Sequence, residues 1–298
     1  MRAGAPIPIR WRVAVGLLQR LPAGALSRLV GRLADVTLPT PLRRPLLGAF
    51  ARLVGADLAE AEQPLSFYPS LDAFFTRHLR PGVRPVDGDP GSVVSPVDAL
   101  VGELGTLQNG HLLQVKGRPY SAASLLGDAA WAQRYEGGPY VTLYLTPRHY
   151  HRIHSPFAGE VVAARHLPGA LLPVSPPAVA LVPELFPRNE RVVCLLEGAV
   201  GGAAVVAVGA TNVGRISTAF DTDWHDRRGG VSNRPGARES VRGYDPPRPV
   251  AKGAELMAFH LGSTVVLLLE AGRLRLAEHL LPGREIRCGQ ALGFRVAG

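Results

Sequence analysis

The residues best suited to chemistry in this sequence are three histidines that lie within six positions. They are His149, His151 and His154, in the run HYHRIH. On a strand, His149 and His151 would share one face and His154 the other, unless the strand ended at the Ser-Pro pair that follows. Such a cluster could act in acid–base catalysis, bind a metal ion or be purely structural. No HExxH or other tight zinc spacing accompanies it, which favours acid–base catalysis.

Asp98 is the second candidate, and it ends the segment Ser95-Pro96-Val97-Asp98. An aspartate after a turn-forming Ser-Pro pair is commonly a turn or cap residue. A carboxylate that a turn holds rigidly could also orient a catalytic histidine. The spacing alone leaves both interpretations open.

The third candidate is the pair Gly262-Ser263 in the segment Leu261-Gly262-Ser263-Thr264, which the apolar run Val265–Leu269 follows. An ordinary turn before a strand is one interpretation. The other is cleavage of the chain by itself, because glycine leaves its own carbonyl sterically open and can adopt strained backbone angles. The serine hydroxyl could then attack that carbonyl if a nearby base takes its proton.

The sequence pattern around these residues predicts an α+β fold, whose helices and strands must position them. After about residue 85, short apolar runs separated by Gly, Pro, Asn or Asp predict a β-rich, sandwich- or barrel-like catalytic core. The predicted strands are 93–94, 100–101, 112–115, 140–145, 161–163, 192–196, 203–208, 264–269 and 285–286. The polar, Gly- and Pro-rich segment 221–250 is predicted to be a long loop.

Before the core, the sequence predicts short amphipathic helices. The first carries apolar residues at helical spacing from Leu26 to Leu33. For the second, Thr40 is the expected N-cap, Pro41 the first helical residue and Gly55 the stop. Ser70 is the expected N-cap of a further short helix over 70–78. We therefore divide the chain into a helical membrane-docking region, 1–85, and a catalytic domain, 86–298.

Positive charge is concentrated at the N-terminal end of the chain. The formal net charge is +9, and residues 1–55 contain nine arginines but a single acidic residue, Asp35. Basic amphipathic helices are typical of docking to an anionic membrane surface, and the alternative is a helical subdomain with a solvated basic face. No aromatic stacking platform or nucleic-acid motif is present, so we expect no nucleic-acid partner.

Two further expectations concern membrane spans and cysteines. The longest stretches without charge or histidine, 167–183 and 198–214, are interrupted by prolines or glycines, so we expect no membrane-spanning helix. Cys194 and Cys288 are too few for a disulfide framework and are expected to be small buried apolar residues.

Six segments in order resemble the phosphatidylserine decarboxylase family. They are FFTR to RPV (74–86), SPVD (95–98), YHRIHSP (150–156), LFPRNERV (185–192), VGATNVG (208–214) and KGAE (252–255), which leads into LGST (261–264). The sequence departs from the family pattern at three positions. Ala99 replaces a usual glycine, His260 stands where many bacterial members have lysine, and Arg215 stands where a small residue is common.

The resemblance implies a pyruvoyl-dependent enzyme that cleaves itself. An Asp98–His154–Ser263 charge relay would activate Ser263 to attack the carbonyl of Gly262. Cleavage would give a β chain, 1–262, and an α chain, 263–298, that begins with a pyruvoyl group made from Ser263. Neither a metal nor pyridoxal phosphate would be needed.

The resemblance also implies the reaction and the partners. The pyruvoyl group would form a Schiff base with phosphatidylserine and yield phosphatidylethanolamine and carbon dioxide. His151 is the candidate that returns the final proton, with His154 as the alternative. The α and β chains would form a heterodimer that could dimerise further, as a peripheral protein on the cytoplasmic face of the cell membrane. A histidine-cluster metal-dependent hydrolase and a non-enzymatic anionic-lipid-binding protein are the alternatives.

Overall fold

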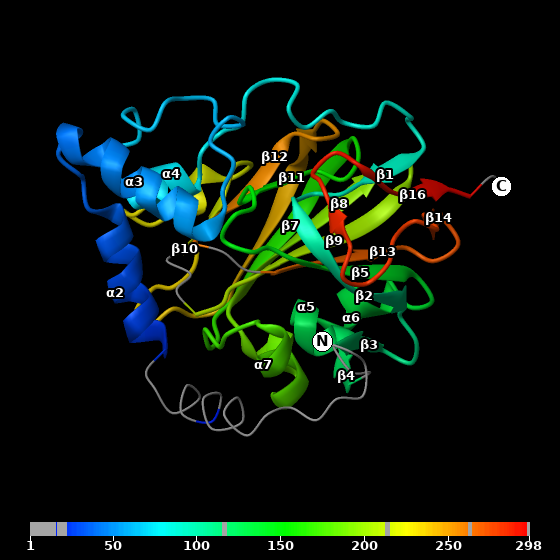
Figure 1. Cartoon of the computed structure of the whole chain (residues 1–298). Helices are drawn as coiled ribbons and strands as arrows, with labels where there is room; N and C mark the ends of the chain where they lie inside the picture. Colours follow the sequence, from blue (N-terminus) through cyan, green and yellow to red (C-terminus); the bar gives the residue numbers. More distant parts are fainter. Residues whose placement is uncertain (1–15, 17–22, 115–117, 212–214, 262–263, 297–298) are drawn as a thin grey trace.

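The computed structural model describes residue 16 and residues 23–114, 118–211, 215–261 and 264–296. Its helical segments are α2 (Ala23–Asp35), α3 (Thr40–Val54), α4 (Leu71–Phe75), α5 (Ala122–Leu126), α6 (Ala129–Gln133), α7 (Pro176–Leu181), α8 (Leu185–Arg188) and the 3₁₀ turn η2 (Thr222–Trp224). In Figure 1, α2, α3 and α4 lie together at one side of the sheets, whereas α5, α6 and α7 lie below them. The predicted α+β class with N-terminal helices and a β-rich core is confirmed.

An antiparallel sheet of eight strands forms the centre of the molecule. Its strands, in spatial order, are β11 (Ser240–Val250), β7 (Gly159–Leu167), β8 (Arg191–Gly198), β9 (Gly201–Val208), β13 (Thr264–Leu269), β5 (Pro139–Tyr144), β2 (Ala99–Thr106) and β15 (Glu285–Ile286). The sheet is open, since β11 and β15 are its two edges. The core is therefore sandwich-like in its layering and is not a closed barrel.

Three smaller sheets accompany the large one. Their strands are β10 (Arg215–Thr218), β12 (Glu255–His260) and β6 (Arg152–His154); β1 (Ser92–Val94), β16 (Ala291–Arg295) and β14 (Leu274–Leu276); and β3 (His111–Gln114) with β4 (Arg118–Ser121). Every run that the sequence analysis assigned to a strand lies in or overlaps one of these strands.

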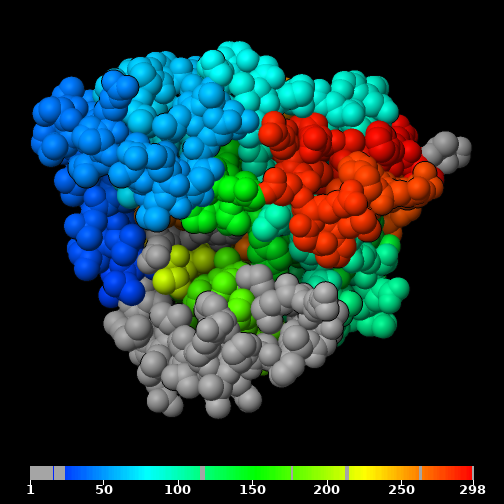
Figure 2. Space-filling view, viewed as in Figure 1, coloured from blue at the N-terminus to red at the C-terminus, as the bar shows by residue number. Residues whose placement is uncertain are grey.

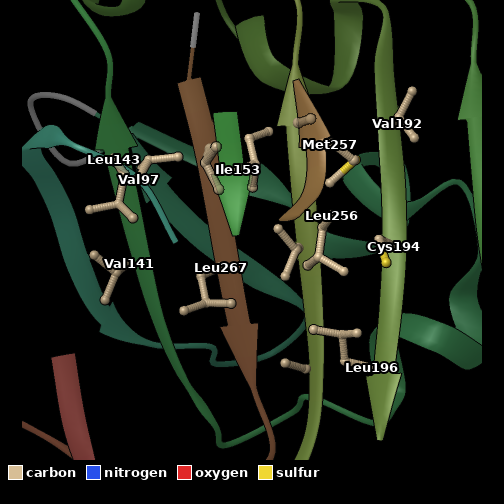
Figure 3. Close-up of a cluster of buried hydrophobic side chains, with 14 of the residues drawn as sticks. Val97, Val141, Leu143, Ile153, Val192, Cys194, Leu196, Leu256, Met257 and Leu267 are labelled. Atoms are coloured by element: carbon tan, nitrogen blue, oxygen red, sulfur yellow. The ribbon is translucent and has the colours of Figure 1, made fainter. Parts of the chain in front are cut away.

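Apolar side chains cover both faces of the large sheet. On β13, Val265 and Leu267 belong to a core that includes Ile153 and Met257 from the sheet of β6, β10 and β12, as Figure 3 shows in part. Val266, between them, belongs to the other core, which includes residues of α5, α7 and α8. Because successive strand residues point to opposite faces, the two layers together favour apolar residues along β13. Its five residues after Thr264 are apolar, and all six residues of the strand are buried.

The prediction of a long loop over 221–250 was wrong for its last 11 residues. Residues 240–250 form the edge strand β11, which pairs with β7. An edge strand bonds on one side only, so it tolerates Pro246 and Pro247, where the pairing register shifts between Gly243 and Arg248. Because of its prolines and charged residues, the segment lacks the alternation of apolar residues that predicts a strand.

The ends of the N-terminal helices largely follow the sequence. Gly55 ends α3 at a φ of 75° and its N–H donates to the carbonyl of Ala51, as expected of a glycine stop. Ser70 accepts from the N–H of Ala73 and so caps α4, although this helix ends at Phe75. The predicted cap of α3 was one residue late, because Thr40 is already helical and Pro39 occupies the N-cap.

The same helices present many apolar side chains to solvent. The exposed residues are Leu26, Leu29, Leu33, Leu42, Leu46 and Leu53, and Leu53 is the most exposed of them at 85%. Figure 2 shows α2 and α3 (blue) on the outer surface of the molecule. Within the part of the chain that the structure describes, no helix is both long and apolar enough to span a membrane.

Candidate active site

The candidate cleavage segment lies where the chain crosses between two sheets. β12 ends at His260 in one three-stranded sheet, and β13 begins at Thr264 in the large sheet. Thr264 pairs with Tyr144 on one side and with Val208 on the other. Gly262 and Ser263, the predicted cleavage pair, lie outside the described residues, but both strands that anchor the segment are described.

Leu261, directly before this pair, has an unusual backbone. Its φ is 75°, a left-handed conformation that costs a non-glycine residue about 1–2 kcal/mol. The side chain is only 9% exposed and packs in a cluster with Ala34 of α2 and Phe75 of α4. The N-terminal helices therefore contact the residue that precedes the candidate cleavage pair.

His154 is arranged as a neutral base. Its Nδ1 lies 2.8 Å from the carbonyl oxygen of Gly253, which can only accept, so Nδ1 carries the hydrogen. Its Nε2 therefore holds a lone pair and accepts from the hydroxyl of Tyr150 at 3.1 Å. Burial is the main cause that lowers the pKa of His154. A neutral imidazole with an unprotonated Nε2 is the form that can take a proton from a serine.

Asp98 lies beside His154 but does not hydrogen-bond to it in the structure. The backbone N–H of His154 donates to the carbonyl of Pro96 in the turn that precedes Asp98. The Asp98 carboxylate accepts from Arg84, at 2.6 Å from Nη2, and from the N–H of Cys288 at 2.8 Å. The group that holds the His154 tautomer here is the Gly253 carbonyl, and the relay role of Asp98 stays a prediction.

The other two histidines of the cluster are buried and neutral. Nδ1 of His149 accepts from the N–H of Thr146 at 3.0 Å, which makes it part of a local turn. Nδ1 of His151 donates to the carbonyl of His149 at 2.8 Å, and its buried Nε2 has no hydrogen-bond partner among the described residues. Burial lowers the pKa of His149 to about 4 and that of His151 to about 3. In this state His151 can accept a proton or hydrogen bond at Nε2, and it must be protonated there before it can donate one.

A second set of hydrogen-bonded carboxylate, histidine and serine side chains adjoins the cleavage segment. The sequence patterns did not predict it. Asp72 accepts from Nδ1 of His260 at 2.8 Å, and Nε2 of His260 lies 3.1 Å from Oγ of Ser217. Arg215 joins Asp72 to Asp35 of α2, with ion-pair distances of 2.9 Å to each. His260 and Arg215 are two of the three departures from the family pattern, and that was the only signal the sequence offered.

Tyr150, Arg84 and Glu60 were also missed as members of the site. Arg84 binds the carboxylates of Glu60 and Asp98 together, both mostly buried. Tyr150 and Arg84 fall inside segments quoted for the resemblance, whereas Glu60 carries no local signal. In the described parts of the chain, no three His, Cys, Asp or Glu side chains are grouped so that they could hold a metal ion.

Comparison with known proteins identifies the family. A family model described as phosphatidylserine decarboxylase matches residues 71–294, which contain every described candidate residue. A protein of Anaeromyxobacter sp. (strain K) is 47% identical over 95% of this chain and 98% of its own length. A protein of Myxococcus xanthus is 41% identical, over 93% of this chain and 96% of its own.

A third relative, from Azotobacter vinelandii, is 43% identical over 92% of this chain and 94% of its own length. All three relatives carry the name phosphatidylserine decarboxylase proenzyme. The expected family is thereby confirmed over most of the length of the chain. The chain is a decarboxylase, a carboxy-lyase, and belongs to the phosphatidylserine decarboxylase family.

Proposed function

We propose that this chain converts phosphatidylserine to phosphatidylethanolamine and carbon dioxide with a pyruvoyl group that it makes from Ser263. The observation that carries the proposal is the place of Gly262-Ser263 between β12 and β13, in a chain whose relatives are named proenzymes. A proenzyme needs a processing step, and a Gly-Ser pair between two anchored strands suits one.

The processing chemistry would use groups of the chain alone. Oγ of Ser263 attacks the carbonyl of Gly262 while a base takes the hydroxyl proton, and the peptide bond becomes an ester. Loss of the α-hydrogen of Ser263 then breaks the ester, which leaves a carboxylate on Gly262 and dehydroalanine at 263. Hydrolysis of the dehydroalanine releases ammonia and leaves the pyruvoyl group.

His154 is the proposed base because its lone pair is on Nε2 and burial keeps the ring neutral. The hydroxyl of Tyr150 occupies that lone pair in the structure, so this hydrogen bond must give way when Ser263 is deprotonated. Asp98 is proposed to stabilise the imidazolium through charge, from the neighbouring turn.

Once formed, the pyruvoyl group supplies an electron sink for the carbanion that loss of carbon dioxide leaves. Among the surrounding side chains, Phe75 is apolar and His151 is neutral, which favours loss of the negatively charged substrate carboxylate as neutral carbon dioxide. Phe75 lies 3.9 Å from the ring of His151, ring centre to ring centre, and both side chains are buried. His151, with its unpartnered Nε2, is proposed to hold and return the proton that replaces the carboxylate.

We further propose that α2 and α3 dock on an anionic membrane from the cytoplasmic side. Their exposed leucines would enter the lipid boundary, and the exposed Arg32, Arg44 and Arg52 would meet anionic headgroups. Each arginine near the surface contributes on the order of 1 kcal/mol of attraction. Co-sedimentation with phosphatidylserine vesicles tests this: Leu53→Ser should weaken binding severalfold, whereas Leu113→Ser, an exposed leucine of β3, should not.

Denaturing mass spectrometry of the freshly purified protein tests the processing. We expect two chains divided between residues 262 and 263, the smaller one carrying a pyruvoyl group at its N-terminus. Ser263→Ala and His154→Ala should leave the chain whole, whereas His279→Ala, a control at an exposed histidine, should be cleaved normally. A single 31.7 kDa species in the unaltered protein would refute the proposal. Stoichiometric zinc in that intact species would favour the metal-dependent hydrolase, and vesicle binding without activity would favour the lipid-binding protein.

A further inference from the structure

Arg77 is a buried cation that lacks a carboxylate partner among the described residues. It follows α4 and is 4% exposed. Its Nη1 lies 3.5 Å from the carbonyl of Phe74, and its guanidinium carbon lies 4.9 Å from the centre of the Phe74 ring. Its Nε is buried and has no hydrogen-bond partner in the part of the chain that the structure describes. Arginine stays charged in proteins, so this guanidinium keeps a positive charge where water cannot solvate it well.

A cleft of about 160 Å³ opens beside Arg77. Its lining includes Asp98 and Tyr150, and the Tyr150 hydroxyl hydrogen-bonds to the proposed base His154. The cleft therefore leads from solvent to the proposed active site.

The other arginines that line the cleft have carboxylate partners. Arg84 binds Asp98 and Glu60, Arg287 approaches Glu60 at 3.7 Å, and Arg148 binds Glu285. The remaining acid of the lining, Asp57, is exposed and accepts from the N–H of Ala59. Arg77 is thus the one cation of the described lining whose charge no ion pair satisfies.

The carboxylates whose charge reaches Arg77, those of Glu60 and Asp98, are both bound by Arg84. His151 is held neutral by burial, and the nearby charge of Arg77 lowers its pKa further. Phe75 connects this pair to the cleavage segment, because it packs against both His151 and Leu261. A buried unpaired cation next to an unpartnered histidine nitrogen is costly unless an anion with hydrogen-bonding oxygens arrives.

We propose that Arg77 binds the phosphodiester oxyanion of the substrate headgroup, an inference that rests on the proposed function. A phosphatidylserine headgroup carries two anions, the carboxylate and the phosphodiester. A cation held against the carboxylate would stabilise the group that must lose its charge as carbon dioxide. The phosphodiester keeps its charge from substrate to product, so Arg77 can bind it throughout and position the serine moiety toward His151 and His154.

The first test measures turnover of dihexanoyl phosphatidylserine, a soluble substrate that removes membrane docking from the comparison. For processed Arg77→Gln we expect KM to rise about tenfold or more, the value of a hydrogen bond to a charged group, with kcat changed less than about threefold. Arg77→Lys should recover part of the loss, and Arg80→Gln, an exposed arginine three residues later, should match the unaltered enzyme. An unchanged KM in Arg77→Gln would overturn the proposal.

The second test needs no processing and no activity. Inorganic phosphate, compared with chloride at equal ionic strength, should raise the melting temperature of the Ser263→Ala precursor and not that of Ser263→Ala/Arg77→Gln. Equal shifts in both proteins would overturn the proposal even if cleavage and decarboxylation occur as expected. A phosphate effect at Arg77 without a KM effect would assign the site to free phosphate and would also overturn it as a headgroup site. If the unaltered chain were never cleaved, this test would still decide whether Arg77 binds a phosphate oxyanion.

Discussion

The backbone of Leu261 can be tested for strain by comparing two substitutions at the same position. Leu261→Ala removes most of a buried side chain but keeps a Cβ at a φ of 75°. Leu261→Gly removes the whole side chain and accepts that φ without strain. At a position with negative φ, the glycine variant is less stable than the alanine variant. A glycine variant that is more stable than the alanine variant at position 261 therefore indicates backbone strain.

The expected magnitudes follow from burial and conformation. Loss of a buried leucine side chain to alanine costs about 2–5 kcal/mol, and Leu261 is 9% exposed within the cluster that includes Ala34 and Phe75. Replacing that alanine by glycine keeps the left-handed backbone but removes its cost of about 1–2 kcal/mol. This gain outweighs the greater conformational freedom of glycine in the unfolded chain. We therefore expect Leu261→Gly to be more stable than Leu261→Ala by about 1 kcal/mol.

Urea unfolding of both variants in the Ser263→Ala background, which keeps the chain in one piece, measures this difference. Leu256 provides the matched control, because it is a buried leucine of β12 without a positive φ. There, alanine should be more stable than glycine by about 0.5–1 kcal/mol. The reasoning fails if alanine is also the more stable replacement at position 261.

Two further predictions concern buried ionisable groups. Burial raises the pKa of Asp72, but the hydrogen bond and charge of His260 and the charge of Arg215 outweigh it, so the net pKa is lowered. The carboxylate therefore stabilises the fold above its unfolded pKa of about 4. In urea unfolding, the difference in free energy of unfolding between Ser263→Ala and Ser263→Ala/Asp72→Asn should narrow from pH 7 to pH 3, and a constant difference would contradict this. Burial also raises the pKa of both thiols, that of Cys288 to about 12, so neither Cys194 nor Cys288 should react with Ellman's reagent at pH 8 until guanidinium is added, and one fast thiol in the folded chain would refute it.

Much of the fold could be predicted because its signals are local. The uninterrupted apolar run of β13 indicates a strand covered on both faces, and it is the strand between β9 and β5. Gly55 and Ser70 act at helix ends through their own backbone or side chain. The buried state of Cys194 and Cys288 likewise follows from their type and is confirmed.

The site could be predicted only in part, because its hydrogen bonds join distant segments. The hydrogen-bond partner of His154 is a backbone carbonyl 99 residues away. Every residue has a backbone carbonyl, so the sequence does not indicate which one is the partner. Asp98 pairs with Arg84 because the turn of Asp98 and the segment of Arg84 meet in the folded protein. The sequence spacing of the two residues does not predict this contact. The chain of Asp72, His260 and Ser217 likewise requires α4, β12 and β10 to come together.

The position of β13 bears on how the mature protein could be taken apart and rebuilt. If cleavage occurs before Ser263 as proposed, the fragment 263–298 supplies a strand from the middle of the sheet, hydrogen-bonded on both sides. The fragment cannot leave without opening the sheet, so the nicked protein should stay whole in solution. Once the sheet is opened, however, recovery becomes an encounter between two molecules and depends on their concentration. The precursor folds as a single chain, and the mature enzyme would keep the structure formed in that step. Separated fragments in dilute solution should regain that structure only slowly.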